Sequence, residues 1–146
     1  MSDAFSKITS ILLCVFMMFI IPVFYMKEES ERLKQTYILA EVTSFVDGVR
    51  NTGILAKDDY DMLEKELFDI GGGYSIRLEH SEHIHDEEGS GLEYFEVRYY
   101  NEQIAECFES GNDYYLKKND YLKVVVYDAA DKLVVWYGGS IRYEAY

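Results

Sequence analysis

The chain has 146 residues, enough for one domain of ordinary size, and its 27 acidic and 14 basic side chains give a formal net charge of −13. This charge repels phosphate backbones and anionic headgroups, which argues against nucleic-acid binding and lipid-surface docking, although solubility alone also explains it. The two cysteines, Cys14 and Cys107, cannot form a disulfide within one domain because Cys14 lies in an apolar run.

The first predicted element is a transmembrane helix over residues 8–26, which follows a short tail of residues 1–7. The run contains no Asp, Glu, Lys or Arg. As a helix it is roughly 28 Å long, which matches a hydrocarbon core of about 30 Å. Pro22 removes one backbone donor without ending such a helix. The predicted membrane anchor consists of Ile8, Ile11, Leu12, Leu13, Val15, Phe16, Phe19, Ile20, Ile21, Pro22, Val23 and Phe24.

A cleaved secretory signal is the alternative interpretation of this run, because Lys7 precedes it. However, the run is longer than the usual signal core of about 7 to 15 residues, and no small-x-small cleavage site follows it. We therefore expect an uncleaved anchor. The Lys and Arg residues near its ends do not decide its orientation. Because residues 27–146 have the length of a folded domain, we expect them to form an extracytoplasmic domain, with a cytoplasmic domain as the alternative.

Beyond the span, the sequence predicts that the helix continues as an amphipathic helix as far as residues 51–53, where Gly53 ends it. Apolar residues recur at spacings of three and four, with Val42 and Val46 among them. The predicted packing face of this helix comprises Leu33, Tyr37, Ala40, Phe45 and Val49.

A short second helix and then several strands are predicted for the rest of the chain. The helix has Asp58 as its candidate N-cap, an apolar face that includes Leu63 and Leu67, and a triple-Gly stop at residues 71–73. Residues 74–80, 92–100, 121–127 and 132–137 have strand patterns, residues 141–146 offer a further edge strand, and residues 101–111 are ambiguous. Asp128 to Asp131 predicts a hairpin turn. The fold class is therefore α+β, with an antiparallel sheet of four to five strands packed on the long helix.

His80, His83 and His85 are the only histidines and precede an acidic stretch, so they are the candidate metal ligands. Imidazole and carboxylate ligands suit zinc, nickel or copper. Their spacing matches no rigid ligand motif, and a solvated hairpin loop over residues 81–91 explains them more simply. The acidic segments at 86–91 and 110–113 also lack the EF-hand pattern. We therefore predict no metal site and no cofactor.

No motif indicates an enzyme. Cys107 has no histidine within twenty residues, so we expect a packed, inert thiol. The glycines at 71–73 lack the Lys and Ser/Thr of a phosphate-binding loop, and Gly89-Ser90-Gly91 does not form a nucleophile elbow. Tyrosines crowd the predicted strands, and those outside the core are candidates for subunit contacts.

A hydrophobic N-terminal helix that runs into an amphipathic helix before a small antiparallel sheet resembles the type IV pilin-like proteins. The segment from Glu41 to His80 also resembles pilin-like proteins of Tad-type pilus loci and conjugative elements of Gram-positive bacteria, and the resemblance covers about residues 8–80. The start MSDAFSK lacks the basic, Gly-ended leader of a prepilin, and no Glu occurs in the apolar run. The resemblance implies no catalysis, lateral packing of the span and subunit contacts by the ectodomain.

Two functions from different classes follow. The first is a single-pass, pilin-like subunit of a Tad-related pilus or of a conjugation or secretion apparatus, whose partners are the lipid bilayer and other pilin-like or apparatus subunits. The second is a membrane-tethered extracytoplasmic binding or sensor module, whose ligand contacts lie in the loop from His80 to Gly91. A cytoplasm-facing regulator ranks third.

Overall fold

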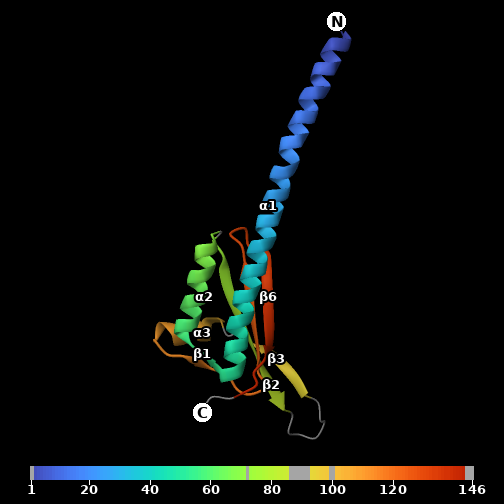
Figure 1. Ribbon diagram of the computed structural model, residues 1–146. Helices are drawn as coiled ribbons and strands as arrows, with labels where there is room; N and C mark the ends of the chain where they lie inside the picture. Colours follow the sequence, from blue (N-terminus) through green and yellow to red (C-terminus); the bar gives the residue numbers. More distant parts are fainter. Residues whose placement is uncertain (1, 72, 86–92, 99–100, 144–146) are drawn as a thin grey trace. The chain divides into compact units, whose positions relative to one another are not determined.

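The computed structural model describes residues 2–71, 73–85, 93–98 and 101–143. The chain divides into two compact units, Met1–Thr36 and Tyr37–Tyr146. The first unit consists of the N-terminal part of helix α1 (Ser2–Thr52), whose remainder belongs to the second unit (Figure 1). The predicted long N-terminal helix is confirmed, and Pro22 lies within it.

Helix α1 ends where the sequence predicts. Gly53 has a φ of 71°, and its N–H donates to the Val49 carbonyl at 2.7 Å. A positive φ is readily adopted by glycine, which has no Cβ, so Gly53 can close the helix and turn the chain.

Helix α2 (Lys57–Ile70) begins differently from the prediction. Its N-cap residue is Ala56, which makes no side-chain cap, so the assignment of Asp58 as N-cap is wrong. Asp58 instead lies in the first turn, where a negative charge interacts favourably with the helix dipole. The Lys57 N–H donates to Asp113 Oδ1 at 3.1 Å, so a residue distant in sequence supplies the acceptor. The helix ends at Gly71, as predicted.

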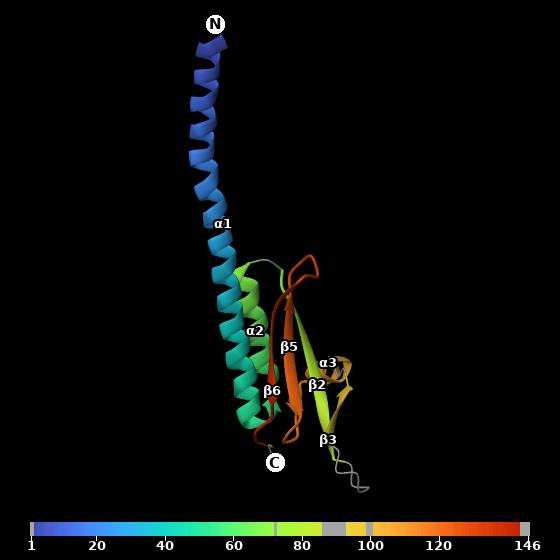
Figure 2. The same cartoon turned by 90° about the vertical axis from the view of Figure 1, so that its right-hand side faces the viewer.

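The main sheet is antiparallel and has the strand order β3-β2-β5-β6 (Figure 2). Its strands are β2 (Ser75–His85), β3 (Glu93–Arg98), β5 (Tyr121–Tyr127) and β6 (Leu133–Ser140). In register, Leu78 of β2 lies opposite Val124 of β5, which lies opposite Tyr137 of β6. The predicted α+β class with a four-stranded antiparallel sheet is confirmed.

Four parts of the chain differ from the prediction or were left open by it. Residues 81–85 continue β2 and pair with β3, so the predicted loop is wrong for these residues, and residues 86–91 lie outside the described part of the chain. The ambiguous segment forms α3 (Asn101–Glu109). A second, two-stranded sheet joins β1 (Ile54–Leu55) to β4 (Tyr114–Tyr115). The proposed edge strand at 141–146 is wrong for residues 141–143, and residues 144–146 lie outside the described part.

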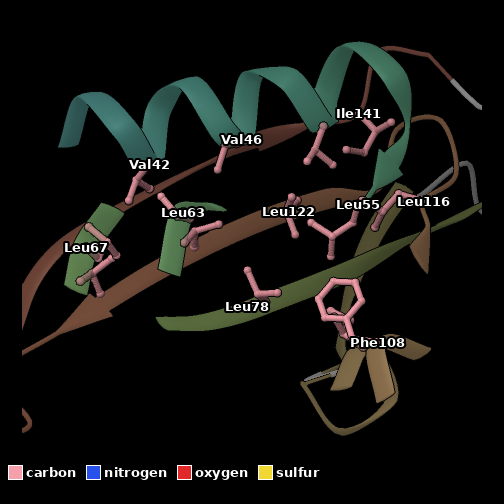
Figure 3. Close-up of a cluster of buried hydrophobic side chains, with 14 of the residues drawn as sticks. Val42, Val46, Leu55, Leu63, Leu67, Leu78, Phe108, Leu116, Leu122 and Ile141 are labelled. Atoms are coloured by element: carbon pink, nitrogen blue, oxygen red, sulfur yellow. The ribbon is translucent and has the colours of Figure 1, made fainter. Parts of the chain in front are cut away.

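The hydrophobic core lies between the sheet and the helices α1 and α2, which run side by side in both views (Figures 1 and 2). Figure 3 shows Val42 and Val46 of α1 pointing toward the side chains of Leu63 and Leu67 of α2. Leu78 and Leu122 contribute from the sheet, and Phe108 contributes from α3.

The buried face of α1 differs in part from the predicted packing face. Val49 is buried and Phe45 is partly buried, but Leu33, Tyr37 and Ala40 are exposed. The fully buried positions are Ile38, Val42 and Val46, which recur every four residues and bring one stripe of the helix against the sheet. The predicted apolar spacing included Val42 and Val46 but took Tyr37 in place of Ile38.

Candidate functional site

The apolar part of α1 is the first candidate site. Every predicted anchor residue is exposed, with side chains that range from 37% exposed at Ile20 to 71% at Phe19. The helix is long and apolar enough to cross a membrane once, and none of its most apolar window is buried. A core helix of a soluble protein would be mostly covered, and soluble proteins rarely expose so large a continuous apolar surface.

Polar residues mark the end of the apolar run. Tyr25 and Met26 are about 70% exposed, and Lys27 follows them. Beyond this point Arg32 forms an exposed ion pair with Glu28 at 2.9 Å, one helical turn away. Such pairs stabilise a helix by only about 0.3–0.5 kcal/mol, so they indicate a water-facing segment rather than a strong contact. An aromatic residue beside the first charges is typical of a membrane–water boundary.

The His80 side chain lies in a buried polar cluster. His80 and Asp120 are 5% and 2% exposed, and His80 Nε2 lies 3.0 Å from Asp120 Oδ2. His80 Nδ1 lies 3.0 Å from the Tyr114 hydroxyl. Both imidazole nitrogens therefore have protein partners, and a metal ion could bind His80 only by displacing one of them.

The side chains of His80 and His83 do not converge. His83 lies three positions after His80 on β2, and side chains alternate between faces along a strand, so the two point to opposite faces. The His85 side chain lies outside the described residues. Among the residues that were described, no group of three or more His, Cys, Asp or Glu could hold a metal ion.

Asp120 is the centre of this cluster, and sequence reasoning missed it. Its Oδ2 also accepts from the Lys117 N–H at 2.9 Å, and its Oδ1 accepts from the His83 N–H at 3.1 Å. Burial raises the pKa of Asp120, but the hydrogen bonds from His80, His83 and Lys117 outweigh that effect, so the pKa is lowered overall. The carboxylate joins β2 to the turn before β5.

The chemistry available to this cluster is structural. Because a carboxylate only accepts hydrogen bonds, His80 Nε2 carries the proton, and in neutral His80 the other nitrogen accepts from the Tyr114 hydroxyl. The hydroxyl, imidazole and carboxylate follow one another as in a catalytic triad. Here His80 and Asp120 are almost fully buried, and their hydrogen bonds connect β2, β4 and a turn, which suits a structural role.

The two cysteines are free: Cys14 is exposed on the apolar helix and Cys107 is partly buried on α3. Comparison of the chain with protein-family models, curated proteins and solved structures found no match in any of the three. The function must therefore be argued from the exposed apolar helix and the domain that follows it.

Proposed function

We propose that this chain is a non-enzymatic, single-pass membrane protein, anchored by residues 8–26 and carrying a folded domain outside the cytoplasm. The observation that carries this proposal is that no residue of an uncharged apolar segment is buried, on a helix that continues without interruption to Thr52. Burying that segment in lipid removes a large apolar area from water, at roughly 25 cal/mol per Å².

Within this role, we propose a pilin-like subunit of a Tad-related pilus or of a conjugation or secretion apparatus. The order of elements supports it: an apolar helix first, then an amphipathic continuation whose Ile38, Val42 and Val46 pack in the core beside an antiparallel sheet. In such a subunit the spans pack laterally. Exposed apolar residues beyond the span, among them Tyr37 and Leu39, are available for contacts with neighbouring subunits.

A tethered binding or sensor module is the alternative, and assembly in cells distinguishes the two. Its predicted ligand contacts lie in the segment from His80 to Gly91, of which residues 86–91 lie outside the described part of the chain; His80 itself already has Asp120 and Tyr114 as partners, which disfavours His80 as a ligand contact.

Crosslinking in intact native cells tests the proposal. In a Cys14→Ser, Cys107→Ser background, Ser30→Cys places one thiol on an exposed position just beyond the apolar run. A membrane-impermeant thiol crosslinker should give specific multimers. The matched control is Ser6→Cys, which should react only after permeabilisation. If only the Ser6→Cys variant reacted in intact cells, the orientation would be the opposite of the one proposed. If the Ser30→Cys variant gave only labelled monomer, the tethered module would be favoured.

A further inference from the structure

A groove lies between α1 and α2 in the second unit. It has a volume of about 240 Å³ and is lined by Glu41, Ser44, Phe45 and Gly48 of α1 and by Asp59, Met62, Leu63 and Glu66 of α2. Its apolar part combines buried Leu63, half-buried Phe45 and Met62, whose side chain is 61% exposed. The groove therefore exposes Met62 and part of Phe45 beside the core residue Leu63.

Gly48 leaves this groove open. A Cβ at position 48 would meet no atom within 4 Å, and Gly48 lies inside helix α1, where glycine costs about 1 kcal/mol relative to alanine. Neither close packing nor a positive φ requires glycine at this position. The missing side chain instead leaves room beside Phe45 and Met62.

The charged residues of the groove are all acidic. Glu41, Asp59 and Glu66 line it, and its lining includes no Lys or Arg. Within the described ranges, no basic side chain forms an ion pair with any of the three. The neighbouring Glu41 carboxyl raises the pKa of Glu66. Acidic groups are thus crowded at the rim of an apolar surface without a cation to balance them.

We propose that this groove docks a basic, amphipathic segment of another protein. Lys or Arg side chains of that segment would pair with Glu41 and Glu66, while an apolar side chain would enter beside Phe45 and Met62. A second copy of this chain is disfavoured, because its net charge of −13 makes two copies repel each other. The partner is therefore a different, basic protein. Only the further step, that this partner is another subunit of the pilus or secretion apparatus, rests on the proposed function.

The test uses the full chain in neutral detergent and a labelled amphipathic peptide of Lys and Leu, about 15 residues long so that it can form a helix. Fluorescence anisotropy should show that Glu41→Gln/Glu66→Gln weakens binding about five- to tenfold. The matched control is Glu102→Gln/Glu106→Gln on α3, which removes the same charge from exposed positions outside the groove and should change affinity less than twofold.

A second variant separates the groove from diffuse charge attraction. Gly48→Leu keeps every charge and fills open space, so it should fold as shown by circular dichroism and yet weaken binding by a similar factor. The proposal would be overturned if the Glu41→Gln/Glu66→Gln and Glu102→Gln/Glu106→Gln variants lost equal peptide affinity, or if Gly48→Leu left the affinity unchanged. Competition by calcium beyond its effect on ionic strength would also overturn it, in favour of a cation site. None of these outcomes depends on membrane orientation or on the formation of multimers. The groove proposal and the proposed function can therefore be refuted independently of each other.

Discussion

The Asp120→Ala substitution is the strongest test of the buried cluster. Asp120 accepts hydrogen bonds from His80 and from the backbone N–H groups of His83 and Lys117. The substitution removes this one acceptor from all three donors, in a site that is 2% exposed. The loss of a buried acceptor costs about 1–3 kcal/mol for each donor that it served, and Asp120 serves three donors. Allowing for water that enters the site, we expect a loss of about 3–5 kcal/mol in the free energy of unfolding.

Urea unfolding of the full chain in detergent measures this loss, with the single tryptophan, Trp136 on β6, as the fluorescent probe. At a slope of about 1–3 kcal/mol per molar urea, the midpoint should fall by roughly 1–5 M. The matched control is Asp113→Ala, which removes one exposed acceptor from the start of α2 and should cost about 0.5–2 kcal/mol. A smaller loss for Asp120→Ala than for Asp113→Ala would refute the reasoning.

The remaining predictions concern the core, the groove carboxylates and two glycines, each followed in the same urea assay. Ile38→Ala should lose about 2–5 kcal/mol because its side chain is fully buried, whereas exposed Leu33→Ala should stay within about 0.5 kcal/mol; similar losses would contradict the observed face of α1. Glu66→Gln should raise the free energy of unfolding at neutral pH, because the raised pKa of Glu66 lowers wild-type stability there. The gain should vanish below about pH 4.5, where the carboxyl is protonated in both states. A gain that persists in acid would contradict this origin. Gly138→Ala should destabilise by about 1–3 kcal/mol because the new Cβ would lie 2.8 Å from the Leu122 carbonyl oxygen, while Gly48→Ala should stabilise by about 0.5–1 kcal/mol; equal signs would refute this contrast.

Local signals predicted the elements whose causes are local. Gly53 ends α1, Gly71 ends α2, and the strand at Tyr121–Tyr127 has the predicted bounds. The Asp128 turn also follows its own residues, because Asp128 Oδ1 accepts from the N–H groups of Ala130 and Lys132. In each case a glycine, a run of apolar residues or an Asp side chain acts within a few positions of itself.

Distant partners explain what the sequence analysis missed. The start of α2 takes its acceptor from Asp113, which lies 56 positions after Lys57. The polar residues 81–85 look like a loop, yet they form a strand because β3 pairs with one edge and Asp120 accepts the His83 N–H. His80 carries a recognisable signal as a histidine, but its partners Tyr114 and Asp120 lie 34 and 40 positions away. No periodic pattern links residues across such separations.

The use of one helix for both anchor and core has a consequence for the proposed function. Ile38, Val42 and Val46 are fully buried, and they lie on the same helix that carries the apolar residues 8–26. Removing α1 would expose the opposing side chains of Leu63, Leu67 and the sheet. The stability of the domain therefore depends on the same helix that, in the proposed function, anchors it in the membrane. A cut within residues 27–36 would release a domain that keeps its core, whereas a cut after Thr52 would remove part of that core. Residues 54–146 alone should therefore fail to melt cooperatively.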